Sequence, residues 1–331
     1  MTTKKKEKGT AADNKDTSLV DFTENLERKA KARSTSRKIK ETEHKLQIQV
    51  QMPIWEEDIR AYPNSLMRGA LFTAGKTSNN LTRDYFESKR VATLAGVSIE
   101  YNGQELRQDD ASVFMTLLHV ARGTALGVPI YFTAYSILKE LGWSLNTAEY
   151  HHLRSCFTRL SSNSITLIQG EGQQGFNGSL IRSFKWIESA NQKSSHWGVI
   201  LEPGIAQLYS TNSFTEMEWA QRKAITGRAP LAQWLHSFLA THQKPYAISV
   251  NKYHELSASK AANLADFRGR LHDALHRLID VGFLAAYSIS NDLVHVERAT
   301  KGTVVKLSKQ SRKKPFIALT NLEDPDLPQL A

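Results

Sequence analysis

Residues 245–298 constrain the fold most, because their pattern predicts two helices and a hairpin in direct succession. Gly282 is expected to end the longer helix, since glycine readily adopts the left-handed conformation found at helix ends. Asn291-Asp292 predicts a turn between two strand-like runs. A short strand, two helices and a hairpin are the layout of a winged helix-turn-helix, a fold that usually places its second helix in the DNA major groove. The longer helix is predicted from apolar residues at helical spacing: Leu264, Phe267, Leu271, Ala274, Leu275 and Leu278.

An earlier segment repeats this order. Pro129 begins a short apolar strand, as Pro245 does later, and a helix, a turn at Gly142 and a second helix follow. The run SITLIQ, a glycine-rich loop and the run SLIRSFKWIE then predict a hairpin with a long wing. An apolar helix is expected before each copy, at 112–122 and at 229–242. The sequence therefore predicts an α+β chain with tandem winged-helix domains and disordered basic flanks.

Charge and polarity set the expected boundaries of these domains. Residues 1–50 hold thirteen Lys and Arg against eight Asp and Glu, a charge of +5, whereas 51–297 carry only +1 and 298–331 carry +4. Such polar flanks cannot bury enough apolar surface to fold alone, and their positive charge raises affinity for phosphate backbones. A charged helix at 22–40 is expected to form on contact with a partner. The expected parts are a disordered basic arm (1–45), a linker (46–64), a first winged-helix domain (65–212), a second one (213–298) and a flexible tail, basic then acidic (299–331).

Several functional classes find little support in the sequence. No apolar run approaches the roughly 20 residues that cross a bilayer, and no signal peptide is recognised, so we expect a cytoplasmic protein with no membrane partner. The single cysteine, Cys156, excludes an internal disulfide and is interpreted as a small core residue. None of the eleven histidines stands in a metal-ligand spacing. We therefore expect no metal, no cofactor and no enzymatic activity.

Local patterns predict a hairpin and a helix cap before the first copy. Apolar residues alternate from Val97 to Tyr101, and Asn102-Gly103 is a strong turn signal. Asp109-Asp110 are expected to cap the helix that follows. The tryptophans are expected to be core anchors: Trp143, Trp186, Trp197 and Trp234.

Several separate motifs resemble the TrfA family of plasmid replication initiators. The stretch YNGQELRQDD is similar to the family's Y-x-G-x-E-L-R-x-D-D, RAYPNSLMRGALFTAGK resembles its P-N…R-x-A-L-F-T segment, and SNDLVHVER resembles its ending. This resemblance covers roughly residues 47–298. It implies a non-catalytic protein of the bacterial cytoplasm that binds repeated origin sites (iterons), helps to melt adjacent AT-rich DNA, and recruits the host initiator and replicative helicase. It also implies self-association as an inactive dimer.

A glutamine-led peptide precedes the first domain. In TrfA-like initiators such a peptide resembles the short motifs that dock on the bacterial sliding clamp. Its counterpart here is QIQVQ at 47–51, with Gln47, Ile48 and Val50 as candidate clamp-binding residues. Gln51 stands where the family has an aromatic anchor, and a peptide in a groove depends on such anchors. An edge strand or a linker is therefore the alternative interpretation.

The second helix of each copy supplies most of the candidate DNA-binding residues. Arginine pairs well with guanine and asparagine with adenine, although half or more of protein–DNA contacts go to the backbone. The second copy's helix begins at 262–266 with fewer basic residues than in the family, so a different iteron sequence is expected. Candidate base readers are Asn146, Thr147, Tyr150, His151 and Arg154, then Ser259, Lys260, Asn263, Arg268 and Arg270; candidates for backbone contacts are Arg159, Arg182 and Lys185.

Three kinds of DNA-binding protein fit these patterns. A replication initiator should distort and open adjacent AT-rich DNA, whereas a winged-helix transcription regulator should only occlude its site. A structural partition or packaging protein should bind with little sequence preference and lose affinity uniformly with salt. The resemblance favours the initiator, and the regulator is the alternative.

Overall fold

A computed structural model describes residues 28–31, 33–36, 52–77, 82–94, 96–169, 174–187, 196–209, 213–225 and 229–299. The chain divides into two compact units, residues 1–49 and 50–331. In the first unit, residues 28–31 and 33–36 are helical with exposed side chains, within the segment where a charged helix is expected. The candidate clamp-binding residues Gln47, Ile48 and Val50 and the tail beyond Ala299 lie outside the described residues.

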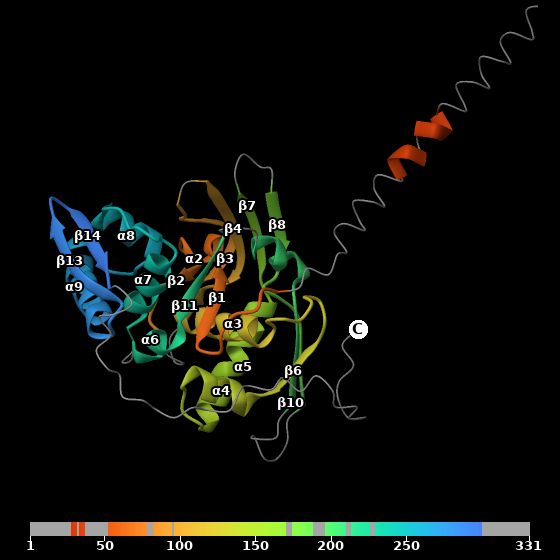
Figure 1. Cartoon of the computed structure of the whole chain (residues 1–331), viewed down its shortest axis with the longest axis horizontal. Helices are drawn as coiled ribbons and strands as arrows, with labels where there is room; N and C mark the ends of the chain where they lie inside the picture. Colours follow the sequence, from red (N-terminus) through yellow and green to blue (C-terminus); the bar gives the residue numbers. More distant parts are fainter. Residues whose placement is uncertain are drawn as a thin grey trace, which may run out of the picture. The chain divides into compact units, whose positions relative to one another are not determined.

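The second unit mixes helices and strands, which confirms the α+β class (Figure 1). Its first part contains β1 (Ile59–Pro63), α2 (Asn64–Met67), β2 (Phe72–Thr73), β3 (Tyr85–Val91), β4 (Val97–Gln104), β5 (Leu106–Arg107) and α3 (Gln108–Val120). Its middle contains β6 (Ile130–Thr133), α4 (Ala134–Leu141), α5 (Thr147–Ser161), β7 (Ser164–Gln169), β8 (Gln174–Gly178), β9 (Ile181–Ile187), β10 (His196–Leu201), a 3-10 helix (Pro203–Tyr209), β11 (Phe214–Glu218) and α6 (Trp219–Ala224). Its last part contains α7 (Pro230–Ala240), β12 (Ile248–Ser249), α8 (Val250–Ser257), α9 (Leu264–Asp280), β13 (Leu284–Ser290) and β14 (Leu293–Arg298). No helix in these described ranges is long and apolar enough to span a bilayer.

One topology occurs twice in this unit, as the repeat in the sequence predicts. In the first copy, β6, the helices α4 and α5, and the hairpin β9–β10 form a three-stranded sheet of order β6-β10-β9. In the second copy, β12, α8, α9 and the hairpin β13–β14 form a sheet of order β12-β14-β13. The helices α3 and α7 precede the two copies. In both copies the last strand lies in the middle of the sheet, between the first strand and the second.

The predicted hairpin from SITLIQ to SLIRSFKWIE is wrong. The strand β7 pairs with β4 and β8 in a separate sheet of order β3-β4-β7-β8, whereas β9 pairs with β10. The pair β7–β8 is therefore an insertion between α5 and the hairpin of the first copy. The copies differ mainly in this addition.

The turn predicted at Asn102-Gly103 is also wrong, because both residues lie inside β4. Gly103 has a φ of +141°, and a Cβ at this position would lie 3.0 Å from the Tyr101 hydroxyl and 3.1 Å from Asn163. The glycine therefore permits a close approach of chains. From sequence alone, a glycine needed for a turn looks the same as a glycine needed for close packing inside a strand.

Two hydrophobic cores fill the second unit. The first extends from Met52 to Trp219, and the second from Ile225 to Val294. Strand β1 pairs with β11 along its whole length, and Trp219 follows β11 into the first core. The first core thus takes in part of the expected linker (46–64) and residues beyond the expected boundary at 212.

Buried polar contacts join the two cores. The guanidinium of Arg222, on α6, donates to Gln108 Oε1 at 3.0 Å and Ser112 Oγ at 3.1 Å on α3, and to Ser237 Oγ at 2.8 Å on α7. Trp234 Nε1 of α7 donates to the Gly69 carbonyl at 3.1 Å. Helix α7 packs against α9 on one side and β11 on the other (Figure 1). Because these partners are buried, rotating one copy against the other would leave polar groups unpaired.

Buried neutral histidines make the fold sensitive to mild acid. Burial, with the charges of Arg60 and Arg122, lowers the pKa of His119 to about 2; its Nδ1 accepts from Trp55 Nε1 at 3.0 Å, and Glu57 lies 3.6 Å from its Nε2. Burial, with the charges of Arg222 and Arg298, also lowers the pKa of His236 well below its usual value. The unfolded chain takes up these protons near pH 6.5 while the folded chain does not. Their stabilising contribution is therefore complete above about pH 6.5 and is lost as the pH falls below it.

We expect each of these histidines to remove about 1.4 kcal/mol of stability per pH unit below about pH 6.5. Urea unfolding midpoints measured between about pH 7.5 and 5.5 check this. The His119→Gln variant should show a shallower loss of stability with acid than the unsubstituted protein. Equal pH slopes for the two proteins would contradict the expectation.

Candidate nucleic-acid interface

The helix pair of the first copy is set by local hydrogen bonds. Thr133 Oγ1 accepts from the Ser136 amide at 3.1 Å and begins α4, and Gly142, with a φ of 73°, ends it. Asn146 Oδ1 then accepts from the Glu149 amide at 2.9 Å and begins α5. The predicted apolar face of α5 is buried at Leu153, Phe157 and Leu160, together with Cys156. The opposite face of α5 is left to solvent.

Most predicted readers of the first copy lie on this exposed face. Thr147 and His151 are exposed, and Asn146 is exposed while its side chain caps the helix. The Arg154 guanidinium lies 4.0 Å from the ring centroid of Trp186 on β9. Trp186 is 37% exposed, so it is not the core anchor that the sequence predicts. The ring instead holds Arg154 beside the hairpin β9–β10 through a cation–π contact.

Two residues of the first copy that the sequence predicts to contact DNA are buried in the structure. Tyr150 is only 8% exposed, and burial raises the pKa of its hydroxyl. Arg159 is 9% exposed, and its guanidinium lies 2.9 Å from Asp110 Oδ1. Both side chains are therefore buried and lie off the exposed face of α5. The amphipathic pattern did not reveal this, because both residue types are common at surfaces.

The predicted backbone contacts on β9 do not form one group. Arg182 is well exposed, with Nε 3.5 Å from Glu202 Oε2, and it stands where the register between β9 and β10 shifts. Lys185 is partly buried and adjoins Trp186, so strand alternation directs the two side chains to opposite faces of the sheet. Only the Trp186 face carries Arg154.

The helix pair of the second copy is built in the same way. Ser249 Oγ accepts from the Lys252 amide at 3.2 Å and begins α8, and Ala258 ends α8 in the left-handed conformation. Asn263 Oδ1 accepts from the Asp266 amide at 2.8 Å and begins α9. The predicted apolar face of α9 is buried except at its first residue, Leu264, which is exposed.

The predicted cations of the second copy all have side chains that are at least two fifths exposed, and all are ion-paired. Lys260, in the turn before α9, lies 2.8 Å from Asp84. Arg270 lies 2.7 Å from Asp266, one helical turn earlier. The remaining predicted residues are Asn263, which is exposed and caps α9, Ser259, which is partly buried, and Arg268, which pairs with Asp292 of the β13–β14 turn at 2.5 Å.

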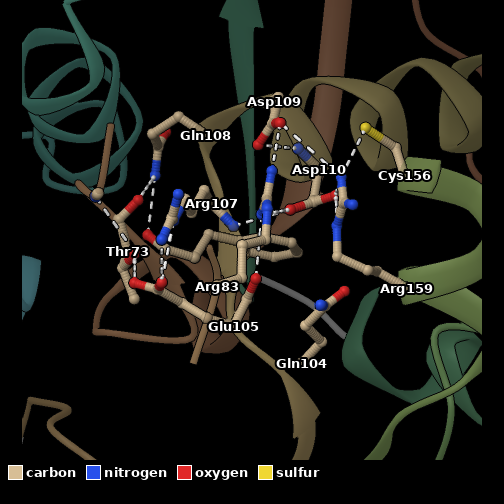
Figure 2. Close-up of polar contacts among 12 residues, drawn as sticks. Thr73, Arg83, Gln104, Glu105, Arg107, Gln108, Asp109, Asp110, Cys156 and Arg159 are labelled. Carbon is tan, nitrogen blue, oxygen red and sulfur yellow. Dashed lines mark hydrogen bonds and ion pairs between the residues drawn. The ribbon is translucent and has the colours of Figure 1, made fainter. Parts of the chain in front are cut away.

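Sequence patterns did not predict a buried ionic cluster that joins α5 of the first copy to α3 and to the chain around β5 (Figure 2). It consists of Arg83, Glu105, Arg107, Asp109, Asp110 and Arg159. Figure 2 shows the side chains of Arg83 and Arg159 directed at the aspartates. Arg83 lies 2.6 Å from Asp110 Oδ2 and 2.5 Å from Asp109 Oδ2. Asp110 also accepts from the Arg107 amide at 2.9 Å, so it helps to cap α3, although it does so from inside the first turn of the helix and not from before it as predicted.

One corner of the buried ionic cluster contains potential metal ligands. Ligand atoms of Asp109, His152 and Cys156 lie within 4.8 Å of one another. Burial raises the pKa of the Cys156 thiol. Burial would also raise the pKa of Asp109, but the hydrogen bond from His152 and the charges of Arg83 and Arg159 outweigh it and lower that pKa. The guanidinium groups of Arg83 and Arg159 already neutralise the Asp109 carboxylate. We therefore interpret these residues as an ion-pairing contact between α3 and α5.

Both the sequence and the fold of this chain resemble those of known proteins. A family model described as TrfA protein matches residues 12–298. The plasmid replication initiator protein TrfA of Escherichia coli is 26% identical over 246 residues, which cover 74% of this chain and 63% of that protein. The chain thus spans less than two thirds of the length of this relative. A crystal structure of domains 2 and 3 of RctB covers 72% of this chain and 99% of its own, with 12% identity and a TM-score of 0.47. A second structure of these RctB domains gives 11% identity and a TM-score of 0.43, covering 70% and 94% of the two chains.

Proposed function

This chain belongs to the TrfA family, and from that membership we propose that it initiates the replication of plasmid DNA. The observation that carries the proposal is the family match over residues 12–298. The name of the Escherichia coli relative, a plasmid replication initiator, supports it. The repeated units, each with an exposed and capped second helix, provide a suitable surface for DNA.

In this proposal both copies act as winged-helix domains on one duplex. Helices α5 and α9 would enter successive major grooves about one turn, or ~10 bp, apart, while the hairpins β9–β10 and β13–β14 would approach the sugar-phosphate backbone. Thr147, His151 and Arg154 are the readers that the first copy presents. Arg268 and Arg270 are those of the second, where arginine suits guanine. Asn146 and Asn263 would contribute mainly by fixing where each helix begins.

Binding energy would drive origin opening in this scheme. Melting or bending DNA costs several kcal/mol, roughly 1–6 for a bend, which cooperative binding to repeated sites would offset. The open AT-rich tract would then receive the host initiator and the replicative helicase. Self-association as an inactive dimer would limit initiation, and the peptide 47–51 would be the contact for the sliding clamp. Each of these steps is a proposal from family membership.

Permanganate footprinting on the supercoiled origin of the protein's own plasmid tests the function. We expect protected repeats beside an AT-rich tract whose thymines become reactive, with host initiator present or absent. A plasmid in which the AT-rich tract is replaced by GC-rich sequence is the matched control and should keep the protection alone. Protected repeats without reactive thymines under either condition would favour a winged-helix transcription regulator instead.

A further inference from the structure

The three candidate DNA-binding cations of the second copy are paired with carboxylates of the same chain. Lys260 pairs with Asp84, Arg268 with Asp292, and Arg270 with Asp266. The partners come from three places: the segment before β3, the turn of the hairpin β13–β14, and the first turn of α9. All six side chains are between about two fifths and three fifths exposed. The pairs therefore lie on the surface that is proposed to meet DNA.

Such pairs contribute little to folding, so their effect on binding matters more. Exposed ion pairs stabilise proteins by only about 0.2–1 kcal/mol. A DNA phosphate, by contrast, must displace the carboxylate before it gains the cation. Nonspecific affinity depends on the number of cations that neutralise phosphates, so each occupied cation lowers it. A specific site can still displace the carboxylate, because a guanine edge or a correctly placed phosphate offers the cation a better partner.

The pair of Lys260 and Asp84 carries the most information, because it joins the second copy to the segment before β3, which lies outside both copies. Lys260 belongs to the α8–α9 turn, whereas Asp84 precedes β3, 176 residues earlier. Lys260 Nζ also lies 3.6 Å from Glu105 Oε2 of the buried ionic cluster. Arg107 and Thr73 hold Glu105 in place, at 2.6 Å and 2.8 Å. The ammonium group is thus held between one exposed and one buried carboxylate.

We propose that Asp84, Asp266 and Asp292 are specificity-determining residues that compete with DNA phosphate for Lys260, Arg270 and Arg268. In the free protein they keep the second copy from binding DNA of random sequence, and the correct origin site displaces them. This rests on the proposed function, since it presumes that the second copy binds duplex DNA. The near-neutral charge of residues 51–297 agrees with a folded region that does not bind DNA through charge alone.

The experiment measures binding of the full chain to a random-sequence duplex of about 30 bp, long enough for both copies. Affinities are taken over a range of salt concentrations for the unsubstituted protein and for Asp84→Asn. We expect Asp84→Asn to bind about 3–10-fold more tightly, with a slope of log affinity against log salt steeper by about 1. Asp84 is exposed, so the variant should fold normally, which thermal unfolding checks.

Three further variants separate competition for Lys260 from a general loss of negative charge: Asp273→Asn, Lys260→Gln, and Lys260→Gln combined with Asp84→Asn. Asp273→Asn removes an exposed carboxylate of α9 for which the described residues show no ion pair, and it should increase affinity much less. In a Lys260→Gln background, Asp84→Asn should give no gain. An equal gain in that background, or from Asp273→Asn, would overturn the inference.

The outcomes also separate this inference from the proposed function. If the unsubstituted protein and Asp84→Asn both fail to bind any duplex, including the plasmid origin, the proposed function fails. If both bind DNA with equal affinity and equal salt dependence, only the inference fails.

Discussion

Replacing Arg159 by methionine should lower the free energy of unfolding by about 3–5 kcal/mol, although sequence patterns place this residue on a DNA-binding surface. Its guanidinium contacts Asp110, which is fully buried, at 2.9 Å, and Asp109 at 3.8 Å. Without it, two adjacent buried carboxylates would share Arg83 as their nearest guanidinium partner. Leaving a buried charge without its partner is among the most costly single changes in a protein. Urea unfolding of Arg159→Met measures the loss.

Two matched variants sharpen this test. Arg182→Met removes the same charge from a side chain that is 59% exposed, and should change stability by no more than about 0.5 kcal/mol. Adding Asp110→Asn to Arg159→Met should restore part of the stability, because the pair is then removed together and no charge is stranded. A loss below about 1 kcal/mol for Arg159→Met would show that the buried ionic cluster does not stabilise the fold as argued.

Replacing Arg154 and Arg270 together by alanine should weaken binding to the origin repeat by about 10²–10⁴-fold. Each arginine that reads a guanine contributes about 1–3 kcal/mol, and free energies at separate sites add. Arg154 stands on α5, held by Trp186, and Arg270 stands on α9, so the double variant removes a reader from each copy. Fluorescence anisotropy with a labelled duplex carrying the footprinted repeat measures the loss.

The single variants and one control show whether both copies, one copy or neither contacts the repeat. Each single substitution should account for about half of the double effect on a logarithmic scale. Lys89→Ala removes an exposed cation from β3, outside both copies, and should cause only the small loss expected from one charge. If one single variant matches the double, one copy alone reads the repeat. If neither variant differs from Lys89→Ala, these helices do not face DNA.

Sequence patterns predicted the helix pair of each copy, because its signals are local, but they placed the start of α3 four residues too late, at 112. The end of α9 at Gly282, the turn at Asn291-Asp292 and the buried faces of α5 and α9 depend on residues a few positions apart. The two residues of that turn have positive φ, as a two-residue hairpin turn of this type requires. Local rules suffice for such features.

What sequence patterns missed depends on partners far away in the chain. Arg159 looks like a surface residue until Asp110, 49 residues earlier, is placed beside it. The run SITLIQ fits a strand in any sheet, and only the three-dimensional structure assigns it to β4 and β8. The ion pair of Lys260 likewise depends on Asp84, which lies far away near the start of the second unit. A charged residue can be recognised in a sequence, but its partner cannot.

The pairing of β1 with β11 has a consequence for synthesis on the ribosome. Tyr62 on β1 contacts Met217 on β11, and the two are 155 residues apart. At about 5–20 residues per second, ~8–30 s pass between the appearance of the first strand and that of its partner. During this interval the nascent first core lacks one strand of this sheet, and the edge of β1 is open to other chains. Translation speed between these strands should therefore influence how much of the protein escapes aggregation.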